Sequence, residues 1–152
     1  MMEQQPVGAD DSADARLACL NLMHAYNNLA DTGQHVLIAD LFAEDAILNA
    51  NGEEMAGIEA IRAGMRRRTA ANLRTVHTCA SVQFGRGGAG ELTALSTLSV
   101  VILTDQPQTL APTIIARVND AFAPLPSGEW RFRRRTLETL SQPQPARPSG
   151  AR

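Results

Sequence analysis

Three side chains in the first half of the sequence could together transfer a proton: Tyr26, Asp31 and His77. An imidazole has an unperturbed pKa of about 6.5, so it can accept a proton at neutral pH. A carboxylate on one ring nitrogen fixes the tautomer and stabilises the imidazolium that forms. We therefore predict that Asp31 contacts His77 inside an apolar pocket. Tyr26 would donate a hydrogen bond to the substrate oxygen that gathers charge.

The same three residues also have purely structural interpretations. His77 could be a hydrogen-bonded core histidine, and Asp31 only a residue of the turn that ends the first helix. Tyr26 could be an amphipathic core residue whose hydroxyl lies at the edge of a pocket. Spacing alone is compatible with both sets of interpretations.

Four further side chains could bind a substrate: Asn27, Ser81, Asp120 and Arg134. Asn27 lies in the first predicted helix, where asparagines near the end more often act as caps. Strict alternation along a strand puts Ser81 on the same face as the histidine. Asp120 could face the pocket or pair with a strand arginine. Arg134 could bind a ligand carboxylate or phosphate, or lie at a solvated edge or subunit contact.

The order of hydrophobic periods predicts an α+β fold. Apolar residues recur with helical spacing over 14–30, 36–42 and 57–70. A short strand at 46–49 precedes the Asn51-Gly52 hairpin signal. Alternation with a period of two then predicts long strands near 74–84, 91–104, 112–122 and 129–140. Such strands curl under their own twist, so helices on the concave side would enclose a pocket.

Composition limits the remaining possibilities. All 14 basic residues among the 152 are arginine, which excludes lysine Schiff bases and a P-loop lysine. The net charge of −2 argues against a nucleic-acid partner, and no apolar run is long enough for a membrane span. We expect a cytoplasmic protein, in which the two cysteines stay free thiols. We expect no metal, because the three histidines are scattered, and no cofactor. The arginines at 66–68 suit the negative end of a helix dipole and need no ligand.

One domain is expected, over residues 13–140. Residues 1–12 contain too few apolar groups to repay ordering, and residues 141–152 are rich in proline. We therefore predict that both terminal segments are disordered tails.

Several stretches, in the right order over about 20–135, resemble the SnoaL-like branch of the NTF2-like superfamily. These stretches are Tyr26 with Asp31-Thr32-Gly33, Leu41-Phe42-Ala43-Glu44-Asp45-Ala46, Gly57-Ile58-Glu59-Ala60-Ile61-Arg62, Arg74-Thr75-Val76-His77-Thr78, Arg117-Val118-Asn119-Asp120-Ala121-Phe122 and Trp130-Arg131-Phe132.

The resemblance is nearest to the scytalone dehydratase and bile acid 7α-dehydratase branch. It implies a cone made of a curved antiparallel sheet and three N-terminal helices, usually assembled as homodimers or homotrimers. In this branch an Asp ends the first helix and a His lies early on the strand after the third helix, and Asp31 and His77 occupy those places. Tyr26 matches a tyrosine of the bile acid enzyme. The second tyrosine and second pocket histidine of scytalone dehydratase are not found at matching places, and the lysine of the related dehydrochlorinase is absent.

The resemblance therefore implies a cofactor-independent, dehydratase-like lyase or an isomerase. An Asp–His dyad would abstract a proton from a small, mostly apolar cyclic substrate. The alternative is a non-catalytic small-molecule-binding or assembly subunit, as in the small subunits of ring-hydroxylating dioxygenases.

Overall fold

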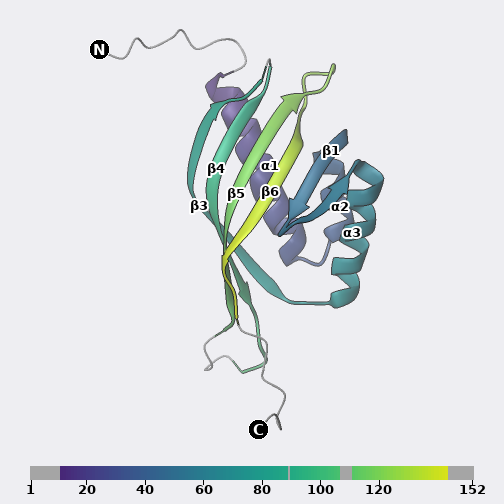
Figure 1. The fold of residues 1–152 in the computed structure, drawn as a ribbon, viewed down its shortest axis with the longest axis vertical. Coiled ribbons are helices and arrows are strands. Elements are labelled where there is room, and N and C mark those ends of the chain that lie inside the picture. Colours follow the sequence, from purple (N-terminus) through teal and green to yellow (C-terminus); the bar gives the residue numbers. More distant parts are fainter. Residues whose placement is uncertain (1–10, 89, 107–110, 144–152) are drawn as a thin grey trace, which may run out of the picture.

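Helices dominate the first half of the chain and long strands the second, as the hydrophobic periods predict. The computed structural model describes residues 11–88, 90–106 and 111–143, and no helix in these ranges is long and apolar enough to cross a membrane. Helices α1, α2 and α3 accompany a six-stranded sheet (Figure 1). The elements are α1 Ala13–Asp31, α2 His35–Ile38, a 3-10 turn Ala39–Leu41, β1 Phe42–Ala50, β2 Glu53–Ala56, α3 Ile58–Ala71, β3 Thr75–Arg86, β4 Leu92–Ile102, β5 Thr113–Pro124 and β6 Trp130–Ser141.

The sheet has the strand order β2-β1-β6-β5-β4-β3. After α3 the chain enters the far edge at β3 and returns through three antiparallel pairings to β6. That path brings β6 beside β1 in the same direction, so this pair is parallel, whereas the other four pairs of strands are antiparallel as expected. The long strands β3–β6 curve around α1, which lies behind them in Figure 1 and leaves the face toward the viewer uncovered.

The core lies between α1 and the concave face of the sheet. Phe132 of β6 lies at the centre of an aromatic cluster, with ring centroids 4.9 Å from Phe42 and 4.8 Å from Phe122. Both cysteines of the chain are free thiols. The buried residues of α1 that pack on this core are Ala15, Cys19, Met23, Tyr26, Asn27 and Ala30.

Ser12 caps the first helix, one residue before the predicted start of the domain at residue 13. Its Oγ accepts a hydrogen bond from the backbone N–H of Ala15 at 3.1 Å. Ser141 likewise belongs to β6 rather than to a tail. The other residues of the predicted tails, apart from Asp11, Gln142 and Pro143, lie outside the described ranges.

We expect Ser12→Ala to lower the free energy of unfolding by about 1 kcal/mol, because it leaves a helix N-terminal N–H without its acceptor. Urea unfolding followed by circular dichroism measures this change. Ser12→Asp, which keeps an acceptor at the cap, is the control and should retain the stability of the original chain. A loss of the same size in both variants would contradict the assignment of Ser12 as a cap.

A β-bulge in β3 reverses the direction of its side chains. The register with β4 shifts between Ala80 and Gln83, and Ser81 has a positive φ of 54°. One extra residue moves every later side chain to the other face. Val82 and Phe84 therefore pack against the core, whereas strict alternation predicted that they face away from the side of the histidine.

A second bulge has the same effect in β6. Phe132 pairs with Phe122, but Arg134 pairs with Ala121, so Arg133 is the extra residue. Phe132 and Arg135 are fully buried, whereas Arg134 is exposed. Of the two arrangements that the sequence left open for Arg134, a ligand contact and an exposed edge, the structure shows the exposed one.

Candidate active site

Asp31, the last residue of α1, lies against the start of β3, the strand on which α1 packs. Its Oδ1 is 2.5 Å from Nδ1 of His77 and accepts a hydrogen bond from the hydroxyl of Thr75 at 3.0 Å. Its Oδ2 accepts the backbone N–H of His77 at 2.9 Å. The carboxylate is thus held by three contacts from one strand. Because the carboxylate accepts a hydrogen bond from Nδ1, the neutral imidazole carries its proton on Nδ1 and presents Nε2 as an acceptor.

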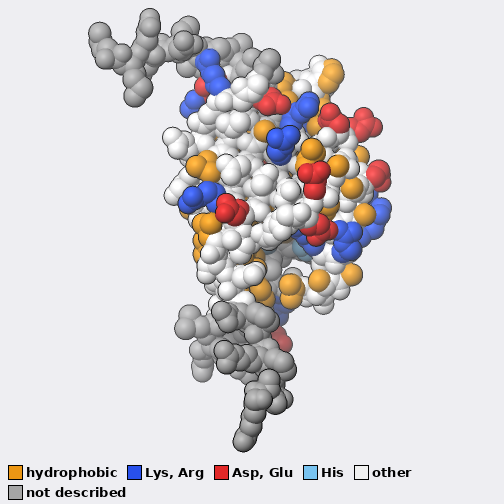
Figure 2. Space-filling model, in the orientation of Figure 1, with side chains coloured by type: hydrophobic (Ala, Val, Ile, Leu, Met, Phe, Trp, Pro, Cys, Tyr) orange, Lys and Arg blue, Asp and Glu red, His pale blue; other side chains and the backbone are white. Residues whose placement is uncertain are grey.

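A pocket of about 300 Å³ opens beside this pair. Its polar wall contains Tyr26, His35, Arg68, Thr75 and His77. Figure 2 shows the surface hollowed near the end of α3, with pale-blue histidine atoms visible there. The inner face of the sheet adds an apolar wall of Leu98, Val100, Ile102, Ile114, Ala116 and Leu137.

Tyr26 lies between two arginines. Its ring is stacked against Arg135, whose Cζ is 4.4 Å from the ring centroid, and its hydroxyl oxygen accepts a hydrogen bond from Nη1 of Arg68 at 2.9 Å. Within the described part of the chain, the hydroxyl proton has no acceptor of its own. It is therefore available to a ligand in the pocket.

None of the four predicted substrate-binding residues lines this pocket. Asn27 is buried in α1 away from it, with an Oδ1 that lacks a partner in the described structure. Ser81 is exposed at the first bulge. Arg134 lines a different hollow, of about 490 Å³, on the uncovered face of the sheet. Asp120 faces the core. Ser81, which strict alternation placed on the side of the histidine, lies in the bulge of β3, and Arg134 follows the bulge of β6.

Asp120 forms a buried ion pair, one of the two arrangements that the sequence left open. Its Oδ2 is 3.0 Å from Nη1 of Arg135, and the side chains are 0% and 1% exposed. Burial raises the pKa of Asp120 to about 6, and the charge of Arg135 opposes that rise. The pair lies beside Tyr26 and holds Arg135 against its ring.

Sequence reasoning did not assign His35, Arg68 or Thr75 to the pocket wall, where the structure places them. Arg68 follows the buried residues Ile61, Gly64 and Met65 at helical spacing, so the period could have assigned it to the inner face of α3. Thr75 lies two residues before the histidine on the same face of β3. His35 begins the short helix α2, and no local pattern indicates where it points.

The surroundings of His35 favour the neutral form of its imidazole. Burial lowers its pKa below 6.5, and the charges of Arg68 and His77 lower it further, whereas Asp31 opposes them. We expect His35 to titrate below the pH of an ordinary histidine, and Arg68→Gln to move its midpoint upward. Histidine ring NMR signals followed against pH measure both effects, with Arg66→Gln as the charge-matched control. A midpoint at or above the ordinary value would contradict this assignment.

In the part of the chain that the structure describes, no three His, Cys, Asp or Glu side chains converge as metal ligands. The chemistry that the described side chains offer is proton transfer by an oriented imidazole beside a phenol and a guanidinium.

Comparison with known proteins identifies the fold. A family model described as a SnoaL-like domain matches residues 11–136, and no curated protein matches the chain. A candidate scytalone dehydratase from Novosphingobium aromaticivorans is 19% identical over 90% of this chain and 94% of its own, with a TM-score of 0.71. ActVI-ORFA from Streptomyces coelicolor is 16% identical over 84% of this chain and 98% of its own, with a TM-score of 0.74. Hexachlorocyclohexane dehydrochlorinase LinA-type3 from Novosphingobium barchaimii is 14% identical over 88% of this chain and 91% of its own, with a TM-score of 0.73.

Proposed function

Because the chain belongs to the SnoaL-like domain family, with its NTF2-like fold, we propose that it is a cofactor-independent lyase of the dehydratase type, or an isomerase. Its substrate is a small, mostly apolar cyclic compound with a carbonyl group. The observation that carries the proposal is the 2.5 Å contact between Asp31 and His77 beside an apolar pocket. Two of the similar structures described above are named as a dehydratase and a dehydrochlorinase, which is consistent with elimination chemistry.

In the proposed reaction, Nε2 of His77 removes a proton from the carbon next to the carbonyl. Asp31 stabilises the imidazolium that forms, and Tyr26 donates a hydrogen bond to the carbonyl oxygen as it gains charge. The bond to a hydroxyl on the next carbon then breaks. The imidazolium returns its proton to this hydroxyl, which leaves as water, so that neither the protein nor the total charge changes. In an isomerisation the same proton returns to another carbon.

A cyclic β-hydroxy ketone tests this proposal directly. Enzymatic loss of water from 3-hydroxy-1-tetralone yields 1-naphthol, whose fluorescence reports the rate. In D₂O, mass spectrometry of 1-tetralone, which lacks the leaving hydroxyl, reports proton exchange at the carbon next to the carbonyl. We expect both rates to exceed those in buffer and to fall to the buffer rate in His77→Gln. His24→Gln, which changes an exposed histidine of α1, is the matched control.

The apolar wall also suits a ligand that is bound without reaction. Binding of 1-tetralone by the original chain, without exchange or dehydration above the buffer rate, would contradict the lyase proposal for this substrate class. That result would favour the small-molecule-binding alternative.

A further inference from the structure

Arg68 places a positive charge in the wall of the pocket. It lies in the last turn of α3, on the face that also carries the buried residues Ile61, Gly64 and Met65. Its side chain is half-buried and lines the pocket together with Tyr26 and the histidines. One of its nitrogen atoms donates to the phenol oxygen of Tyr26.

Arg68 differs from the other arginines in its surroundings. In the described ranges, eight arginines pair with carboxylates, and three others without such a pair, Arg66, Arg117 and Arg134, are exposed. Arg68 is half-buried, yet no described carboxylate lies within ion-pair distance of it. Tyr26 raises the pKa of Arg68, and Glu53, which also raises it, is already paired with Arg67.

Among the described residues, no carboxylate lines the pocket to neutralise this charge. Asp31 is the acidic member of the dyad, and its oxygens are engaged by Thr75 and His77. The wall opposite is aliphatic. A guanidinium removed from water needs a counter-charge, and its planar fork matches a carboxylate with two parallel hydrogen bonds.

We propose that Arg68 binds a carboxylate of the ligand, so that the substrate is a cyclic, largely apolar carboxylic acid. Calling the ligand a substrate rests on the proposed function. The assigned binding site for the carboxylate does not depend on catalysis. The carboxylate takes the nitrogen atoms of Arg68 that Tyr26 does not use, and the ring lies against the aliphatic wall. The anchored acid group then fixes which carbon of the ring reaches His77, which makes Arg68 a specificity-determining residue.

A pair of isosteric ligands tests the assignment. Isothermal titration calorimetry compares the binding of 2-naphthoate with that of 2-naphthamide, which has the same shape and apolar area. The measurement is made at a pH about two units above the ordinary histidine pKa, so that the imidazoles are neutral. We expect the original chain to bind the carboxylate roughly 10-fold to 100-fold more tightly, as for a hydrogen bond between charged groups. Arg68→Gln should lose this preference and keep its affinity for the amide.

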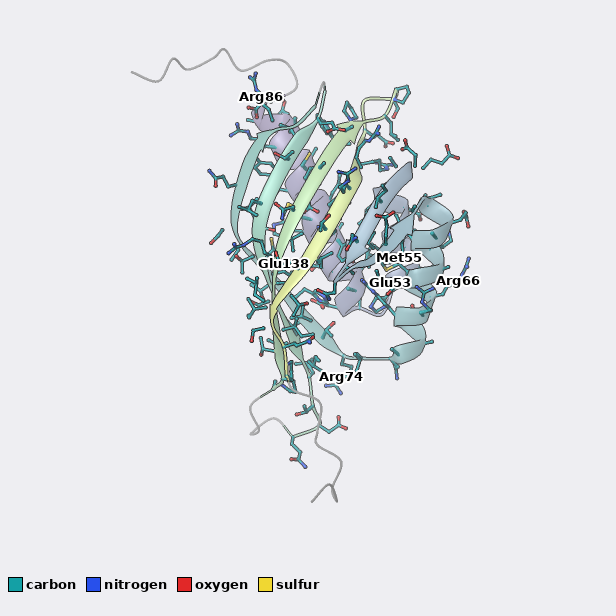
Figure 3. All side chains as sticks on the ribbon, in the orientation of Figure 1. Glu53, Met55, Arg66, Arg74, Arg86 and Glu138 are labelled. Carbon is teal, nitrogen blue, oxygen red and sulfur yellow. The ribbon has the colours of Figure 1, made fainter. Side chains whose placement is uncertain are left out.

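Arg66→Gln is the matched control, because it removes the same charge from the same helix. Figure 3 shows Arg66 on the outer side of α3, directed away from the sheet. The Arg66→Gln variant should retain the preference for the carboxylate ligand. Equal binding of both ligands by the original chain, or a preference that persists in Arg68→Gln, would overturn the assignment. His77→Gln separates the two proposals: it should abolish turnover and leave the carboxylate preference intact.

Discussion

Asp31→Asn is expected to lower kcat on a substrate of this enzyme by roughly 1,000-fold to 10,000-fold. The amide can donate a hydrogen bond to Nδ1 of His77, where the carboxylate accepts one. The imidazole proton then moves to Nε2, and the ring presents a donor to the substrate where a base is needed. The variant also loses the negative charge that stabilises the imidazolium. Stopped or continuous assays of 1-naphthol formation would measure the loss.

Asp40→Asn is the matched control for this prediction. Asp40 is an exposed acid that pairs with Arg62 at 3.3 Å, outside the pocket. Its substitution should leave kcat unchanged. Circular dichroism and calorimetric binding of 1-tetralone would establish that Asp31→Asn is folded and binds the ketone. An Asp31→Asn variant as active as the control would show that the carboxylate does not orient a catalytic base.

Arg135→Met is expected to lower the free energy of unfolding by about 3–5 kcal/mol at mildly alkaline pH. The substitution leaves the carboxylate of Asp120 buried without its counter-charge, and it removes the cation stacked on Tyr26. The double variant Asp120→Leu/Arg135→Met should regain most of the loss, because apolar side chains replace both charges. Urea unfolding measures all three chains. Arg67→Met, which breaks an exposed pair with Glu53, should cost less than about 1 kcal/mol.

The same pair predicts a specific dependence on pH. The pKa of Asp120 is raised from 3.8 to about 6 in the folded chain, so the folded state binds the proton more tightly than the unfolded state. The contribution of Asp120 to stability is therefore full below its unfolded pKa and is lost as the pH rises through its folded pKa. Without Arg135 the pKa rises further, and the loss extends to higher pH. The defect of Arg135→Met should thus be smaller in mild acid than in mild alkali. A defect that is independent of pH would contradict this account of Asp120.

Local patterns in the sequence were enough to predict most of the fold. Helical spacing and the Asp31-Thr32-Gly33 terminator predicted α1 to within one residue at each end. The four long strands were predicted to within two residues at their ends, because alternation and Gly- or Pro-rich turns are properties of neighbouring residues. Family resemblance identified Asp31 and His77, which the structure places in contact, and their catalytic role stays a proposal.

Tertiary structure decided which side chains face the pocket. A bulge adds one residue to a strand at little local cost, and only the register with the neighbouring strand shows where it lies. For this reason alternation alone could not show that Ser81 and Arg134 face outward and that Arg135 faces the core.

The sequence by itself determined the order and type of the elements, since those depend on contacts between residues a few positions apart. The partners of buried charges depend on residues far apart in the chain that packing brings together. Arg68 meets the Tyr26 hydroxyl across 42 positions, and His35 joins the pocket wall from a helix of four residues. No local period carries that information, because it arises only when α1 and α3 close over the curved sheet.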